Sequence, residues 1–168
     1  MTYEEGRRKF IQTWGTLGSS WGINRTMAQV HALLMISPRP LCADEIMADL
    51  RISRGNANMN IRALVDWGLA HKEIVPGDRR DFYGGEKDVY KVALQIMKER
   101  RKRELDPVVQ VLEDLQQVDI DATDADQAEF REMVDHLNGF THKADNMLET
   151  LVHKDEHWFY GRFLKMLV

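Results

Sequence analysis

Residues 43–68 read ADEIMADLRISRGNANMNIRALVDWG and decide the fold, because they contain two short helical patterns separated by three residues. In the first pattern the apolar residues recur at i, i+3, i+4 and i+7, as on one face of a helix: Ala43, Ile46, Met47 and Leu50. Ser53 is a good N-cap for the second helix, and Gly68 suits the left-handed residue that ends one. The predicted buried stripe of this second helix is Ala57, Ile61, Leu64 and Val65. The segment therefore predicts a helix, a tight turn and a second helix.

A small β-hairpin is expected directly after the second helix. The stretch from Leu69 to Val75 is short and partly β-prone, and Asp81 to Tyr83 can return as a second strand. Between them, Pro76-Gly77 suits the centre of a type II turn. A helix-turn-helix followed by a hairpin is the order of a winged helix-turn-helix. We therefore predict a mainly α fold in which residues 24–87 form a winged helix-turn-helix domain with a small β-hairpin wing.

Residues 1–23 precede this domain and predict an amphipathic helix that serves dimerisation or packing. Its apolar pattern runs from Tyr3 to Leu17. Glycines at positions 15, 18 and 22 are expected to interrupt and end this helix. Asn24 is a good N-cap for the next helix, which we expect to end near Ser37 because two prolines follow.

Residues 88–168 predict a helical dimerisation and possible effector region. The helical pattern resumes at Asp88, and Asp106-Pro107 predicts either a kink or the start of a new helix. Another helix is expected from about Asp124, and a last one from Glu156 to Leu167. Several apolar residues of the helix after Asp124 are predicted to face inward: Phe130, Met133, Val134, Leu137, Ala144, Leu148 and Leu151.

The composition is that of a globular protein that folds in water. Of the 168 residues, 43% are hydrophobic and 30% charged, and no apolar stretch approaches the ~20 residues that span a bilayer. The single cysteine, Cys42, excludes an internal disulfide and any paired-cysteine zinc or redox motif. We expect a cytoplasmic protein without a cofactor or membrane partner.

Charge is strongly segregated along the chain, although the net charge is only −4. Residues 51–103 hold 13 Lys/Arg against 7 Asp/Glu, whereas residues 104–168 hold 5 against 15. A basic middle in an acidic protein is typical of a local surface that binds phosphates.

The helix that begins after Ser53 has the residue types of a DNA recognition helix, here taken as residues 53–67. Asparagine can pair with adenine and arginine with guanine in the major groove, and a helix N-terminus suits a phosphate. Asparagine is a poor helix former, and this helix contains three of them in five residues. Helix stability therefore does not account for their presence. The candidate DNA-binding residues on this helix are Ser53, Arg54, Gly55, Asn56, Asn58, Met59, Asn60 and Arg62.

The predicted wing tip, residues 76–81, contains two adjacent arginines, Arg79 and Arg80. Two guanidinium groups on a projecting hairpin suit insertion into a minor groove or contact with phosphates. They complete the candidate DNA-binding residues.

The segment from Ser53 to Arg62, followed by Trp67-Gly68-Leu69, resembles the MarR superfamily of winged-helix regulators. It is most similar to the GbsR-like branch, the repressors associated with glycine betaine synthesis and uptake. The resemblance continues through residues 76–80, 88–90 and 100–107, and so covers roughly Trp21 to Val109. It implies a homodimeric DNA-binding repressor or activator, with the terminal helices at the dimer interface and a wing arginine in the minor groove. Gly84-Gly85 departs from it, because less flexible residues are expected where the wing strand ends.

Dimerisation is also expected on physical grounds, because two recognition helices one helical turn apart multiply affinity and specificity. The expected partners are therefore a double-stranded DNA operator and a second copy of the chain. The terminal apolar stripes can instead close within one chain. The operator sequence, the regulated genes, the direction of regulation and any small-molecule effector stay open.

Two weaker patterns and two rival classes complete the sequence reading. His153 and His157 lie at i and i+4, near His136 and His142, but no third metal ligand is well placed. Aromatic residues that invite a cage for a quaternary ammonium ligand are Trp14, Trp21, Trp67, Trp158 and Tyr160. No catalytic motif is present, so an enzyme is not expected. The remaining alternative is a winged helix that binds protein instead of DNA.

Overall fold

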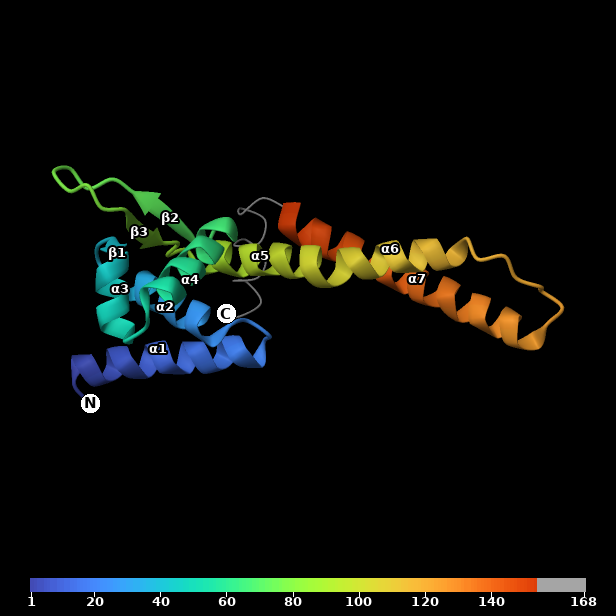
Figure 1. The fold of residues 1–168 in the computed structure, drawn as a ribbon. Helices are drawn as coiled ribbons and strands as arrows, with labels where there is room; N and C mark the ends of the chain where they lie inside the picture. Colours follow the sequence, from blue (N-terminus) through green and yellow to red (C-terminus); the bar gives the residue numbers. More distant parts are fainter. Residues whose placement is uncertain (154–168) are drawn as a thin grey trace, which may run out of the picture. The chain divides into compact units, whose positions relative to one another are not determined.

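The computed structural model describes residues 1–153, which fall into two compact units, Met1–Gln95 and the chain from Ile96 onward. The first unit holds α1 (Tyr3–Ser20), α2 (Arg25–Ile36), β1 (Leu41–Cys42), α3 (Ala43–Leu50), α4 (Arg54–Asp66), β2 (Ala70–Glu73), β3 (Phe82–Gly85) and the start of α5 (Val89–Arg100). The strands form an antiparallel sheet in the order β1-β3-β2. The loop between β2 and β3 projects away from the helices as a wing (Figure 1). The fold is thus mainly helical with a winged helix-turn-helix, as predicted.

The turns that separate these elements form as the sequence predicts. Asn24 Oδ1 accepts a hydrogen bond from the Met27 amide at 3.1 Å, which caps α2. Gly68 has φ +68° and ends α4, and Gly77 has φ +86° in the wing. The Asp78 amide donates to the Val75 carbonyl at 3.1 Å and closes the wing turn around Pro76-Gly77.

Strand β1 and the end of β3 differ from the predicted wing. β1 has only two residues, and it pairs through Leu41 with Tyr83. The second wing strand begins at Phe82 and continues to Gly85, past the predicted end. A Cβ at Gly85 would lie 2.9 Å from the Leu34 carbonyl carbon. Gly85 is therefore required where β3 packs on the main chain of α2, and it is not a flexible strand end.

Replacing Gly85 with alanine is expected to destabilise the protein by about 1–3 kcal/mol. The added methyl group would meet main-chain atoms of Leu34 and Met35, which cannot move aside as a flexible side chain can. Urea unfolding of the wild type and Gly85→Ala measures this loss. An unchanged midpoint would show that β3 does not pack closely on α2.

Helix α1 packs along α2 at a crossing made close by glycine. A Cβ at Gly18 would lie 2.5 Å from Ala28 Cβ. The prediction that Gly15 and Gly18 interrupt the helix is therefore wrong. Both are buried inside α1, which continues to Ser20. Gly22, at φ +75°, lies after its end.

His31 is buried between α1 and α2, with 3% of its surface exposed. Trp14 Nε1–H donates to His31 Nδ1 at 3.4 Å, so the neutral imidazole carries its proton on Nε2. Burial lowers the pKa of His31 from 6.5 to about 4. The folded protein therefore keeps this side chain uncharged at neutral pH.

Acid is expected to destabilise the fold through His31. Because its pKa is lower in the folded than in the unfolded chain, the unfolded state binds more protons between pH 4 and 6.5. The contribution of His31 to the free energy of unfolding is fully present above pH 6.5. It falls by about 3 kcal/mol as the pH drops to 4. Urea unfolding across this range should show a shallower pH dependence for His31→Gln, whose amide oxygen can still accept from Trp14. If the wild type and His31→Gln lost stability equally with falling pH, His31 would not be the group that destabilises the fold in acid.

The second unit contains a helical hairpin. A π-helical turn, η1 (Arg101–Leu105), precedes α6 (Asp106–Gln116), and α7 (Ala125–His153) packs against α6. Pro107 lies in the first turn of α6, and because the backbone is helical on both sides of η1, its missing N–H leaves out one helical hydrogen bond next to the π-helical turn. Arg101 Nη2 donates to Asp145 Oδ2 of α7 at 2.8 Å. The predicted helix from Glu156 to Leu167 lies outside the described residues, and within them no helix could span a membrane.

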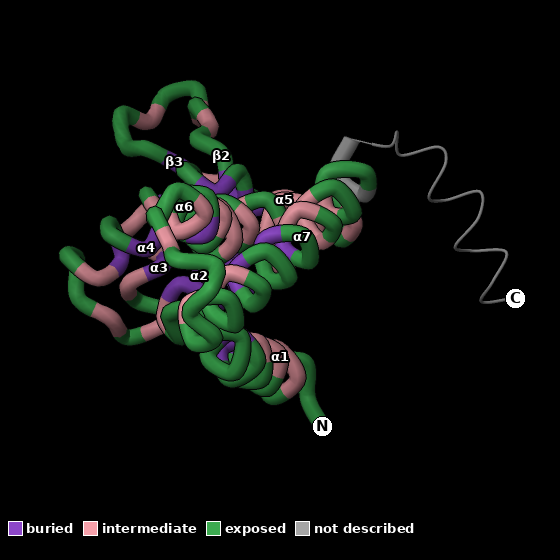
Figure 2. Tube along the Cα trace, turned by 90° about the vertical axis from the view of Figure 1, so that its right-hand side faces the viewer, coloured by how far each residue is buried: buried purple, intermediate pink, exposed green. Residues whose placement is uncertain are grey.

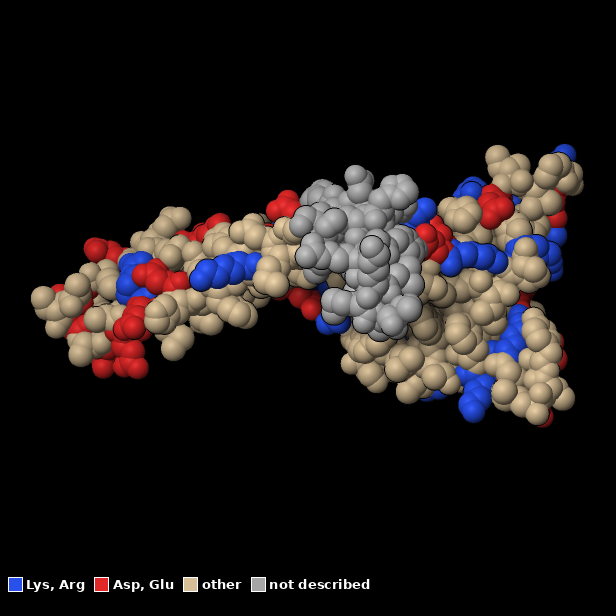
Figure 3. Space-filling model, turned by 180° about the vertical axis from the view of Figure 1, so that it is seen from behind, with Lys and Arg blue, Asp and Glu red and all other residues tan. Residues whose placement is uncertain are grey.

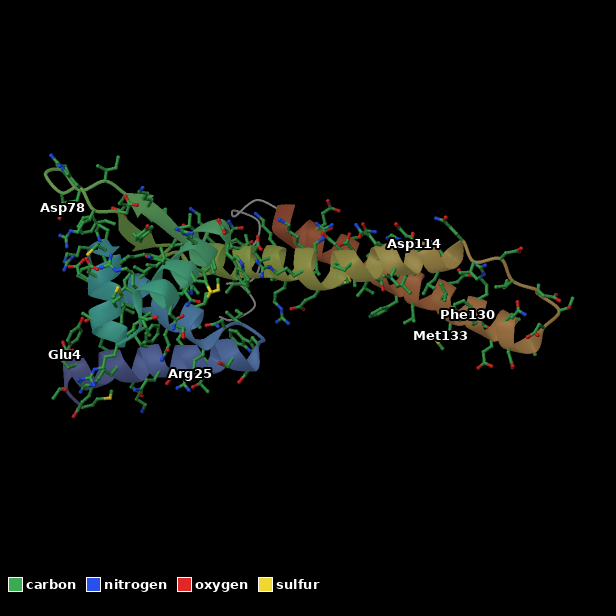
Figure 4. The ribbon with its side chains drawn as sticks, in the orientation of Figure 1. Glu4, Arg25, Asp78, Asp114, Phe130 and Met133 are labelled. Atoms are coloured by element: carbon green, nitrogen blue, oxygen red, sulfur yellow. The ribbon has the colours of Figure 1, made fainter. Side chains whose placement is uncertain are left out.

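One face of α7 packs on α6 and another lies open. Val134, Asn138 and Thr141 are buried on the first face. Figure 2 shows buried positions on α7 in purple. The predicted inward direction of Phe130, Met133 and Leu137 is wrong for the single chain, because these side chains are 42%, 57% and 46% exposed. Phe130 and Met133 extend from α7 on the side away from α6 (Figure 4).

Candidate nucleic-acid interface

The outer face of α4 carries four exposed residues at i, i+3, i+4 and i+7: Gly55, Asn58, Met59 and Arg62. Met59 is 59% exposed, although it is a large apolar residue. Arg62 is exposed and makes no hydrogen bond or ion pair with the residues that the structure describes. These four, all among the predicted DNA-binding residues, form one stripe, which we call the α4 stripe.

The N-terminal end of α4 places Ser53 and Arg54 beside this stripe. Ser53 Oγ accepts a hydrogen bond from the Asn56 amide at 3.3 Å and caps the helix. Arg54 Nη2 lies 2.8 Å from Asp44 Oδ1 of α3, and both side chains are more than half exposed. Exposed pairs of this kind contribute little to stability. Arg54 can therefore exchange Asp44 for another anion, such as a phosphate, at small cost.

Two residues of α4 lie on faces other than the predicted ones. The buried stripe is Ala57, Asn60, Ile61 and Leu64, whereas Val65 is 38% exposed. Asn60, expected on the DNA-facing side, is buried because its amide Nδ2 donates within the helix, to the Asn56 carbonyl at 2.8 Å. Asn56 itself is half-buried at the edge of the α4 stripe.

The wing presents both predicted arginines to solvent, and one of them is held in place. Arg80 grips Asp78, with its Nε 3.0 Å from Oδ1 and its Nη2 2.5 Å from Oδ2, and its guanidinium lies 5.3 Å from the centre of the Phe82 ring. The hydrogen bonds from Arg80 lower the pKa of Asp78 to about 2, so its carboxylate is charged at neutral pH. Asp78 lies near the tip of the wing (Figure 4). Arg79 is exposed beside it.

The charged side chains are distributed differently in the two units. Figure 3 shows Lys and Arg over the wing and the neighbouring helices of the first unit. Asp and Glu gather around the loop between α6 and α7, which contains Asp119, Asp121 and Asp124. In the first unit, cationic side chains therefore lie on the wing and on the helices beside it.

The histidine and aromatic patterns form no site in the described part of the chain. No group of three potential metal ligands is found there, and His142 Nε2 lies 3.6 Å from Glu113 Oε1. Trp14 stacks on Phe10 in the first unit, and Trp67 is buried. The side chain of His153, and all of His157, Trp158 and Tyr160, lie outside the described residues.

The fold is that of a winged helix-turn-helix protein, and α4 and the wing carry exposed arginines on its surface. Residues 21–81 match the family model described as MarR family. The match covers the winged-helix part of the chain, which is therefore similar to the winged-helix domain of MarR-family proteins.

A solved structure described as a transcriptional regulator is similar in fold. It has a TM-score of 0.65 at 15% identity, over 88% of this chain and 95% of its own. No curated protein matches the sequence.

Proposed function

We propose that the chain is a sequence-specific, double-stranded DNA-binding transcriptional regulator that acts as a homodimer. Residues 53–67 enter the major groove, and residues 76–81 reach the minor groove. The α4 stripe carries this proposal, because it combines an arginine, an asparagine and a glycine on a protruding helix face. Asp78 holds the side chain of Arg80 in one orientation on the wing. An arginine oriented before binding suits contact with a phosphate or with a narrow minor groove.

Gly55 supports contact between α4 and an external partner. A Cβ at this position would meet nothing within 4 Å, and the backbone is ordinary helix. Glycine in a helix costs about 1 kcal/mol relative to alanine, so no feature of the fold favours it here. The space above Gly55 is what a DNA backbone needs for close approach to the first turn of α4.

Replacing Gly55 with alanine is expected to raise stability and to weaken DNA binding. The free energy of unfolding should rise by about 0.5–1 kcal/mol. Affinity for a duplex selected by the wild type from a random library should fall about tenfold, as for the loss of one contact. Urea unfolding and fluorescence anisotropy measure the two effects.

Gly139→Ala provides the matched control. Gly139 also lies within a helix, and its Cβ would also meet nothing within 4 Å. This variant should gain similar stability and keep its DNA affinity. Full affinity in Gly55→Ala would contradict the close approach of DNA to α4.

The homodimer is supported by the open face of α7. Its apolar residues follow the 3,4 spacing of a heptad and form what we call the α7 seam: Phe130, Met133, Leu137, Phe140, Ala144 and Met147. Phe140 is 71% and Met147 69% exposed. A contiguous apolar stripe of this length is rare on a monomer, and a second helix with the same spacing covers it. We propose that the α7 seam pairs with that of a second copy.

The finer assignments follow from the resemblance, apart from the location, which rests on the single cysteine. We propose the GbsR-like branch of the family, a repressing role, a cytoplasmic location and, where an effector acts, control through the helical region after residue 88. An effector would act by preferring one spacing of the two recognition helices.

A further inference from the structure

The α4 stripe carries one large apolar side chain, that of Met59, which is 59% exposed. Its neighbours one turn away on the stripe are Gly55 and Arg62. The helix does not require methionine here, because lysine and glutamine have nearly the same helix propensity and would keep the surface polar. The core does not require it either, because α4 meets the core through its opposite face. The fold of the single chain therefore does not account for Met59.

The Met59 side chain projects from α4 and does not lie along it. Long side chains on a helix lean toward its N-terminus, which for Met59 is the direction of Gly55. A Cβ at Gly55 would nevertheless meet nothing within 4 Å, so Met59 does not fold back onto the first turn. Its apolar end is therefore available to a partner that approaches the α4 stripe.

The chemistry of methionine restricts what it can recognise in the major groove. Its sulfur is a weak hydrogen-bond acceptor, and the side chain has no donor. The base edges in the major groove present hydrogen-bond donors and acceptors, and the apolar group among them is the C5-methyl of thymine. Contact between the two removes apolar surface of both from water.

We propose that Met59 is a specificity-determining residue that recognises a thymine through its C5-methyl group. This inference rests on the proposed DNA binding, in which the α4 stripe enters the major groove. The contact is apolar and adds a preference for one base, whereas arginine contacts with phosphates carry no sequence information. It accounts for a large apolar side chain on the stripe beside Gly55, where the DNA can come close.

Replacing the thymines one at a time with deoxyuridine, in a duplex that the wild type enriches from a random library, tests the proposal. Deoxyuridine pairs with adenine as thymine does and lacks only the methyl group. At one of these positions the wild-type affinity, measured by fluorescence anisotropy, should fall about fourfold, as for the loss of one buried methyl group. Met59→Gln keeps an unbranched side chain but replaces its apolar end. This variant should bind the thymine and deoxyuridine duplexes equally at that position.

Val65→Gln is the matched control. It also replaces an exposed apolar side chain of α4 with glutamine, at a position outside the α4 stripe. This variant should distinguish thymine from deoxyuridine as the wild type does. Because both variants change exposed side chains, urea unfolding should show that both fold like the wild type.

Two results overturn the proposal in distinguishable ways. If the enriched duplex contains no thymine at which the wild type depends on the methyl group and Met59→Gln does not, Met59 does not recognise thymine, and the proposed DNA binding still stands. If the wild type enriches no motif, the proposed DNA binding fails and the inference fails with it.

Discussion

Replacing Arg79 and Arg80 together with alanine is expected to weaken binding to the selected duplex roughly 100-fold at moderate salt, since each arginine contributes about 1–3 kcal/mol. Both side chains are exposed on the projecting wing. The variant also removes the Arg80 partner of Asp78, so the Asp78 carboxylate is left uncompensated near the phosphates. The slope of affinity against salt should fall by about 1 for each lost phosphate contact. Fluorescence anisotropy across a salt series measures both quantities.

Arg8→Ala/Lys9→Ala is the matched control for the wing variant. It removes the same charge from an exposed pair on α1, which packs along α2. Its affinity should stay within about twofold of the wild type if the charge of the wing, rather than net charge, determines binding. Equal losses in both double variants would refute a specific role for the wing.

Introducing charge into the α7 seam is the second change with a large expected effect. Leu137→Glu/Phe140→Glu places two carboxylates where we propose that two copies meet, and burying them costs several kcal/mol. The protein should become monomeric in analytical ultracentrifugation. Affinity for a two-half-site operator should fall by at least about 100-fold, because one recognition helix reads only a half-site.

His136→Glu/Asn146→Glu is the control for the seam variant. Both positions are exposed on α7 and lie outside the α7 seam. This variant should stay dimeric and bind normally. If the seam variant also stays dimeric, the α7 seam is not the interface.

Local sequence signals predict the helix-turn-helix and the wing turn well. Ser53 caps α4, Gly68 ends it, and Pro76-Gly77 forms the centre of the wing turn, each through contacts within a few residues. Capping and turn formation depend on such near neighbours, so a single sequence contains the required information.

Features that depend on distant partners are predicted poorly. β1 has two residues and exists because Leu41 meets Tyr83, far along the chain. Gly18 and Gly85 mark close packing on α2, which from the sequence is indistinguishable from flexibility. The exposed apolar face of α7 has the same 3,4 periodicity as a buried one, so the pattern does not reveal what covers it.

The exposure of the candidate residues on α4 follows the helical pattern, except where a polar residue lies on the buried face. Gly55, Met59 and Arg62 lie on the exposed stripe, as the helical rotation predicts. Asn60 and Val65 exchange faces relative to the prediction, because the amide of Asn60 is satisfied by the helix itself. A hydrophobicity pattern has no means of detecting that compensation.

The most direct test of DNA binding compares a duplex enriched from a random library with a scrambled duplex of the same composition. Fluorescence anisotropy of the purified protein, across a salt series, measures both affinities. We predict a salt-sensitive preference of about 1,000-fold or more for the enriched duplex. Equal or negligible binding to both would contradict the account and would favour a winged helix that binds protein.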